Sequence, residues 1–293
     1  MKSISRAVVA AGLLAAGSAQ AVQFVGITTD NRITSFDSAT PSNWSPLISV
    51  TGVTPGARIV GIDTRPGDSK IYGVATDNKL YTINESTGVA TFKADLTGAT
   101  IQSGLSYGID FNPVADAGTG ASLRLVTSAG NNYAVNANTG VIGNTASMIP
   151  SNIGGVAYTH SGITPAPTST QLYYIDFATD RLLVANGAFN SPTLMEVGSL
   201  GLDTIGAHGF EILANGQAFA TLTSGVTGQS GFYSIDLMTG AASLAGEFGA
   251  ATPLLSGLTA VGVTPVPEAE TYMLMLSGLG LLGWRTTRRK RLG

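Results

Sequence analysis

Three acidic residues occupy matching places in a repeated strand pattern and are the best candidates for a ligand site in this 293-residue chain. Asp63, Asp110 and Glu211 each lie in a short apolar segment that is typical of a strand. If the repeats form a ring, these carboxylates lie near its central channel, where they could bind a cation or a sugar. The alternative is that they face water or accept hydrogen bonds from neighbouring backbone. The stretch from Asp110 to Asp116 lacks the oxygen spacing of an EF-hand, so no dedicated calcium loop is predicted.

One stretch matches a nucleophile motif. Residues 104–108 read G-x-S-x-G, with His160 and His208 downstream, but a nucleophile elbow needs a strand that turns sharply into a helix. A later segment resembles this stretch and has Thr259 in place of Ser106, so we predict that the motif opens an inner strand of the repeat. Two histidines are too few for a metal cluster, and the absence of cysteine excludes thiolate sites and disulfides. We therefore expect no catalytic residue, no metal and no cofactor.

One phrase recurs five times and predicts the architecture: a strand, a short polar turn, a second strand and often a closing Thr-Gly. Its turn positions are Asp30, Asp77, Gly130, Asp180 and Gln229, which are 47, 53, 50 and 49 residues apart. A further strand precedes each hairpin after the first, as at 59–63, and a fourth follows it, as at 90–94. Four strands in a unit of about 45 residues are typical of a β-propeller blade.

The N-terminal unit lacks its first strand, and a strand-like segment at 256–263 belongs to no other unit. A ring closed by this C-terminal strand beside the N-terminal hairpin explains both observations, and closure protects exposed sheet edges. We therefore predict an all-β, five-bladed propeller over residues 22–265, flanked by a signal helix and a C-terminal transmembrane helix.

Residues 1–21 have the features of a signal peptide. Lys2 and Arg6 form a positively charged segment, and an uncharged apolar run follows at 7–17. Ala19 and Ala21 then supply the small-x-small pattern of a signal peptidase site. We expect cleavage before Val22 and export to an oxidising compartment.

Residues 266–293 have a three-part order of their own. Val266, Pro267 and Glu268 are followed by an uncharged run at 271–284, which predicts a short transmembrane helix. The helix would end at Trp284 and be anchored by the basic residues Arg285, Arg288, Arg289, Lys290 and Arg291. Because positive residues stay on the cytoplasmic side, the rest of the chain would lie outside the inner membrane.

This tail resembles the PEP-CTERM sorting signal, which exosortases recognise in Gram-negative bacteria that make exopolysaccharide. The resemblance rests on Val266-Pro267-Glu268, on the apolar residues 274–283 and on the basic cluster, while Ala269 replaces the second proline of the motif. It implies a precursor held transiently in the inner membrane, cleavage near Pro267-Glu268, and release or transfer to the cell surface.

The body resembles the DUF4394 family of bacterial secreted proteins. The resemblance is carried by the phrase at Thr76–Gly88 and by Val60–Asp63, which reads V-G-I-D. It implies propeller-like repeats and supplies no activity and no site residues.

The net charge of residues 22–265 excludes one class of partner. Without the two ends the body keeps 8 basic and 16 acidic residues, a net charge of −8, so nucleic acid is not an expected partner. We predict a non-enzymatic surface or extracellular-matrix protein that works as a binding or structural module in an exopolysaccharide biofilm. Its expected partners are signal peptidase, exosortase and exopolysaccharide or another surface component. The alternative is a secreted hydrolase or lyase that uses acidic channel residues, which would require convergent groups with shifted pKa values.

Overall fold

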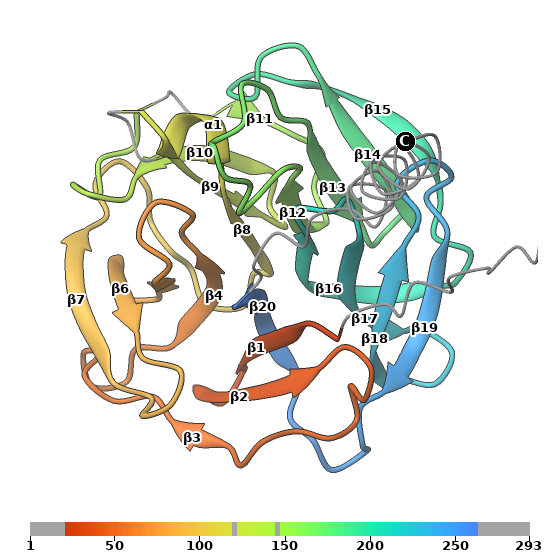
Figure 1. Cartoon of the computed structure of the whole chain (residues 1–293), viewed down its shortest axis with the longest axis horizontal. Coiled ribbons are helices and arrows are strands. Elements are labelled where there is room, and N and C mark those ends of the chain that lie inside the picture. Colours follow the sequence, from red (N-terminus) through yellow and green to blue (C-terminus); the bar gives the residue numbers. More distant parts are fainter. Residues whose placement is uncertain (1–20, 119–121, 144–146, 263–293) are drawn as a thin grey trace, which may run out of the picture. The chain divides into compact units, whose positions relative to one another are not determined.

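The computed structural model describes residues 21–118, 122–143 and 147–262 (Figure 1). In this part of the chain the strands form five four-stranded antiparallel sheets around a central axis, which confirms the predicted five-bladed propeller. Ala19, the sorting motif at 266–268 and the predicted transmembrane and basic segment lie outside the described residues. No helix in the described ranges is long and apolar enough to cross a membrane.

Four blades are meanders of consecutive strands, with the first strand nearest the axis. Blade 2 consists of β4 (Ile59–Thr64), β5 (Ile71–Ala75), β6 (Lys79–Ile83) and β7 (Ala90–Asp95). Blade 3 consists of β8 (Tyr107–Phe111), β9 (Ser122–Thr127), β10 (Asn131–Asn136) and β11 (Ser147–Met148), with the short helix α1 (Pro113–Asp116) after β8. Blade 4 consists of β12 (Ile153–Tyr158), β13 (Leu172–Asp176), β14 (Arg181–Asn186) and β15 (Thr193–Ser199). Blade 5 consists of β16 (Thr204–Ile212), β17 (Ala218–Ser224), β18 (Ser230–Ile235) and β19 (Ala242–Glu247).

Blade 1 joins the two ends of the propeller. It contains β1 (Gln23–Thr28), β2 (Arg32–Asp37) and β3 (Ile48–Ser49), with β20 (Leu255–Val261) as its innermost strand. β20 pairs antiparallel with β1, from Gln23 opposite Val261 to Ile27 opposite Gly257. The predicted closure by a C-terminal strand is therefore confirmed.

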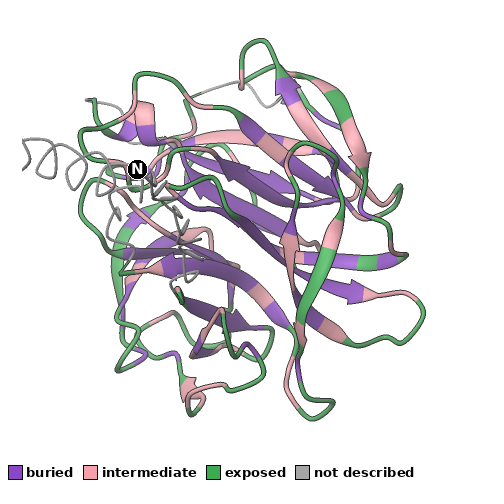
Figure 2. Ribbon diagram, turned by 45° about the vertical axis from the view of Figure 1, so that its right-hand side comes forward, coloured by how far each residue is buried: buried purple, intermediate pink, exposed green. Residues whose placement is uncertain are grey.

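The core is divided among the blade interfaces. Five apolar clusters occur in the described part, and each combines residues from two neighbouring blades. On β1, for example, Phe24 packs against Phe219 and Phe232 of blade 5, whereas Val25 belongs to the cluster shared with blade 2. The inner strands are consequently buried on both faces, as the purple ribbons of Figure 2 show.

The asparagines of the repeated turn phrase form hydrogen bonds between neighbouring blades. Asn31 and Asn78 adopt left-handed backbone conformations in their hairpin turns, with φ of 66° and 59°. Their side-chain oxygens accept hydrogen bonds from Ile59 N at 2.9 Å and Ile101 N at 2.6 Å, where the chain enters the following blade. Asparagine suits this place because its short amide tolerates the left-handed region and satisfies a backbone donor.

A ring of glycines brings the five inner strands together. One glycine stands at the same position of each strand: Gly61, Gly108, Gly155, Gly209 and Gly257. A Cβ at Gly209 would lie 2.5 Å from the Leu258 Cβ, and one at Gly257 would lie 2.7 Å from the Ile62 nitrogen. Neighbouring inner strands therefore approach closely in this layer, and the residues two positions further along each strand meet near the axis.

Candidate functional site in the central channel

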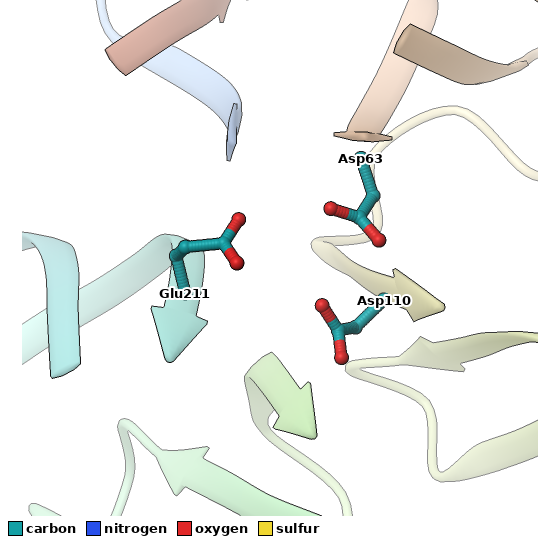
Figure 3. A group of neighbouring side chains, drawn as sticks. All are labelled: Asp63, Asp110 and Glu211. Atoms are coloured by element: carbon teal, nitrogen blue, oxygen red, sulfur yellow. The ribbon is translucent and has the colours of Figure 1, made fainter. Parts of the chain in front are cut away.

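The ring position two residues after each glycine carries the candidate site. Asp63 on β4, Asp110 on β8 and Glu211 on β16 occupy it in blades 2, 3 and 5 (Figure 3). Blade 4 has Ala157 and blade 1 has Thr259 at the equivalent places. The structure thus brings together the three carboxylates that the sequence singled out.

This register corrects one expectation. The comparison of segments predicted that Thr259 corresponds to Ser106, but Thr259 lies opposite Val25 on β1 and takes the position of Asp63. The resemblance between the two stretches comes from a shared Ser-Gly-Leu phrase at a different register. Gly257 aligns instead with Gly108, because each glycine must meet the next inner strand.

The polar ring residues bind the backbone of the next blade. In each case the side chain accepts a hydrogen bond from the amide that follows the next ring position. The bonds run from Phe111 N to Asp63 Oδ2 at 2.6 Å, Tyr158 N to Asp110 Oδ2 at 2.5 Å, Ala260 N to Glu211 Oε2 at 3.2 Å, and Thr64 N to Thr259 Oγ1 at 2.9 Å. Ala157 has no side-chain oxygen and cannot do the same. The carboxylates therefore link blades as well as lining the axis, which was the alternative that the sequence left open.

The three carboxylates are buried close to one another. One oxygen from each lies within 4.8 Å of the others, and the residues are 3%, 1% and 5% exposed. Desolvation by burial raises the pKa of Asp63 to about 7, although backbone and hydroxyl donors oppose the shift. Burial and the neighbouring carboxylates raise the pKa of Asp110 and of Glu211 well above their ordinary values. The cluster is therefore not fully ionised at neutral pH.

Asp63 and Asp110 differ in the number of hydrogen bonds that their carboxyl groups accept. Asp63 accepts bonds from Phe111 N, from Thr64 N at 2.7 Å and from the Thr259 hydroxyl at 3.1 Å. Asp110 accepts one backbone bond and faces both other carboxylates, which disfavour its charge.

The chemistry open to such a cluster is limited to oxygen ligation and proton exchange. Ca²⁺ and Mg²⁺ prefer carboxylate and carbonyl oxygens, so these three side chains are the residues that could hold a hard cation. Without a cation, burial raises the pKa of all three carboxyl groups and so favours their protonated form, which can donate a hydrogen bond.

A pocket opens where the inner strands end. It has a volume of about 390 Å³ and is lined by residues that follow β4, β12, β16 and β20, with Glu211 in its wall. Thr64, Arg65, Ser161 and Thr164 contribute polar groups to the lining. We call it the channel-mouth pocket. A volume of this size is within the usual range for small-ligand sites.

One residue of the pocket wall is held by an ion pair that the sequence did not reveal. Arg65 Nε donates to Asp116 Oδ1 at 2.6 Å, and the second Asp116 oxygen accepts from Gly67 N at 2.7 Å. Asp116 ends the short helix α1, which is capped by Asn112. Both oxygens of Asp116 are therefore engaged by groups of blade 2.

The remaining residues that the sequence offered for chemistry are Ser106, His160 and His208. Ser106 precedes β8 rather than a helix, and its backbone nitrogen donates to Ser128 Oγ at 3.0 Å, so the G-x-S-x-G stretch opens an inner strand as predicted. His160 is exposed in a turn with φ of 66°, and His208 is half-buried within β16.

Comparisons with known proteins agree with the repeat and the tail. A family model described as "Domain of unknown function (DUF4394)" matches residues 32–259, and the PEP-CTERM protein-sorting motif matches residues 265–291. No curated protein matches the chain.

Two solved structures match the chain at low sequence identity. A protein of unknown function from Bacteroides caccae is 11% identical, with a TM-score of 0.40, covering 83% of this chain and 100% of its own. A calcium-binding protein, regucalcin, from Agrobacterium tumefaciens is 14% identical, with a TM-score of 0.42, covering 80% of this chain and 72% of its own. The family match spans most of the chain, and the motif implies an exported exosortase substrate with a membrane-anchored precursor. The chain belongs to the DUF4394 family and carries a PEP-CTERM sorting signal.

Proposed function

We propose that this protein is a non-enzymatic binding module of the cell surface or extracellular matrix, and that it holds a hydroxyl-rich ligand, such as a unit of exopolysaccharide, in the channel-mouth pocket. The observation that carries the proposal is the pocket itself, which places the Glu211 carboxyl in one wall and hydroxyl groups around it. Sugars are recognised by convergent donors and acceptors of this kind.

The raised pKa and the fixed orientation of the Glu211 carboxyl suit it to hydrogen bonding with a ligand. Burial and the neighbouring Asp63 carboxylate raise the pKa of Glu211 well above its ordinary value, which favours the protonated form, and this form can both donate and accept a hydrogen bond. Its Oε2 atom is already held by Ala260 N, which fixes the direction of the group. A fixed neutral donor and acceptor matches a sugar hydroxyl, which is itself both donor and acceptor.

The second candidate is a hydrolase or lyase, and a specific observation favours it. A raised carboxyl pKa at a pocket is also the property of a general acid. Against it, the other two carboxyls are held by Phe111 N and Tyr158 N, and Asp63 accepts two further bonds. A catalytic partner would need an oxygen that water or substrate can reach, and neither Asp63 nor Asp110 is among the residues that line the pocket.

Binding and catalysis make opposite predictions for Glu211→Gln. The glutamine keeps an acceptor for Ala260 N and a donor for the ligand, so we expect the affinity for saccharides from the host's exopolysaccharide to change less than about threefold. Glu211→Met should lower the affinity by at least about tenfold, since it removes a hydrogen bond to a buried group. Calorimetric titration measures both, and circular dichroism verifies the fold.

A second variant separates loss of binding from loss of folding. Ser161→Trp places a large ring at the pocket wall without altering the carboxylates, so it should block binding and leave the melting temperature unchanged. Full saccharide binding by Ser161→Trp would exclude the channel-mouth pocket as the site. Turnover of the saccharide that Glu211→Gln abolishes would establish the hydrolase or lyase instead.

Processing gives an independent prediction. If an exosortase cuts near Pro267-Glu268, mass spectrometry of material released by a producing host should find no peptide beyond about residue 270. Replacement of Pro267 and Glu268 by alanine should leave the full-length chain in the membrane fraction. Recovery of the intact basic tail from extracellular protein would refute cleavage at this place.

A further inference from the structure

A second hollow continues from the channel-mouth pocket across blade 2. Its volume is about 410 Å³, and it shares Ser69, Ile71 and Glu85 with the first pocket. The shared residues lie in or beside the β4–β5 and β6–β7 connections, which end on the same side of the blade. We call it the blade-2 groove. Each of the two hollows has the size of a complete small-ligand site, and the three shared residues place them side by side.

Strand register explains the direction of the groove. Thr82 on β6 lies directly opposite Tyr72 on β5 and Thr91 on β7, so these residues form a row across the sheet. Thr82 and Thr91 line the groove, and both are at least partly exposed. The groove therefore runs outward across the strands, from the neighbourhood of the axis toward the outer edge of the blade.

Most of the polar side chains along the groove are free to bind a ligand, whereas Asn84 and Thr87 bond to each other. Among the described residues, no hydrogen bond or ion pair engages the side chains of Ser69, Lys70, Thr82, Glu85 or Thr91. The wall residue Arg65 differs, because its guanidinium is occupied by Asp116 and by neighbouring side chains.

The lining also indicates the class of ligand. Ile71 and Ile83 are almost fully buried beneath the groove, at 3% and 5% exposed, which leaves Val89 as the exposed apolar residue among its lining residues. An extended peptide would need apolar pockets for its side chains. The body has a net charge of −8, so a polyanion is disfavoured as well.

We propose that the ligand is a neutral polysaccharide strand, which enters the channel-mouth pocket with one unit and lies along the blade-2 groove with the following units. This inference rests on the proposed function and extends it from a single sugar unit to a polymer. Lys70 and Glu85 contact hydroxyl groups of the strand, and Thr82 and Thr91 contact it further out.

A length series tests the polymer. The probes are neutral saccharides from monosaccharide to hexasaccharide, prepared from the exopolysaccharide of a host with an exosortase and titrated into the exported protein by calorimetry. We expect the affinity to rise at least about tenfold from the shortest probe to the longest, since added units gain hydrogen bonds along the groove. An acidic hexasaccharide and an extended peptide of equal length should bind more weakly than the neutral hexasaccharide.

A double variant tests whether the rise in affinity with saccharide length comes from the blade-2 groove. Thr82→Val with Thr91→Val keeps the β-branched shape and removes both hydroxyls, so the blade should fold normally. It should lower hexasaccharide affinity by about tenfold and leave monosaccharide binding unchanged. The matched control is Ser234→Ala with Ser243→Ala, the same two positions in blade 5, which should alter neither affinity.

The outcomes separate the two proposals. Binding of the monosaccharide with no gain from length, or a gain that survives the threonine double variant, would overturn the polymer groove and leave the pocket function intact. Tighter binding of the peptide or of the acidic hexasaccharide would replace the neutral polysaccharide as ligand. Absence of binding by every saccharide would overturn both proposals.

Discussion

Asp110→Asn is expected to make the protein more stable than the unmodified chain at pH 8, with a melting temperature about 5 °C higher. Asp110 is 1% exposed and faces Asp63 and Glu211, which together with burial raise its pKa. An asparagine oxygen can still accept the bond from Tyr158 N, and its amide nitrogen can donate to a neighbouring carboxylate. The substitution therefore removes the cost of burying an ionisable carboxyl group beside two others, while both hydrogen-bonding functions remain.

The pH dependence of the unmodified protein follows from the same groups. Asp63 has an ordinary pKa of 3.8 and a folded-state pKa of about 7, so between these values the folded state holds a proton that the unfolded state has lost. The stability contributed by protonation of Asp63 is then fully present below about pH 4 and is lost as the pH rises through 7, by up to about 1.4 kcal/mol per pH unit, and the raised pKa values of Asp110 and Glu211 act in the same direction. Asp110→Asn should flatten this decline.

Thermal unfolding between pH 5 and pH 9, with a chelator present to exclude cations, measures both effects. Asp110→Leu should be less stable than the unmodified chain at all these pH values, because Tyr158 N then lacks its acceptor. The control is Glu247→Gln, an exposed carboxylate far from the axis, which should change nothing. A loss of stability in Asp110→Asn at pH 8 would show that the cluster is ionised and satisfied by other means.

The fold was predictable because the repeat signals are local and recur. Alternating apolar residues, an Asp-Asn turn and a closing Thr-Gly identify each hairpin, and a period near 49 residues reveals five units. The closing strand was inferable because one unit lacked its inner strand, and β20 indeed pairs with β1. Strand bounds agree closely because the turns are formed by residues with specific backbone preferences.

The candidate site was predictable only in part. Matching sequence positions placed Asp63, Asp110 and Glu211 near the axis, but their bonds to the next blade depend on the offset between inner strands, which no local signal reports. Thr259 was missed because Ser-Gly-Leu drew the comparison to the wrong register, although Gly257-Leu-Thr259 matches Gly61-Ile-Asp63. The Arg65–Asp116 ion pair joins residues 51 positions apart and has no sequence signature.

Gly257→Ala is expected to destabilise the closed ring by about 2–3 kcal/mol, the upper part of the range for overpacking in a dense core. The added Cβ would lie 2.7 Å from Ile62 N and 3.0 Å from the Gly61 Cα, and neither backbone atom can move without displacing β4. The backbone of Gly257 is not in the left-handed region, so the loss comes from steric conflict, chiefly with the blade 2 backbone and also with Ile27 Cγ2 of β1 at 3.1 Å. Since Gly257 lies on β20, the strain acts where the last strand completes the propeller.

Denaturant unfolding of the exported protein measures this change, and Gly249→Ala is the matched control. A Cβ at Gly249 would meet only Thr252 Cγ2 at 3.8 Å, an ordinary contact, so its effect should stay within about 0.5 kcal/mol. A second variant, Gly108→Ala, should resemble Gly257→Ala because its Cβ would lie 2.9 Å from Val156 N in another blade interface. If both ring variants are as stable as Gly249→Ala, the inner strands are not in close contact and the carboxylates need not meet at the axis. A loss at both positions supports the five-glycine ring as the layer that fixes the distances within the site.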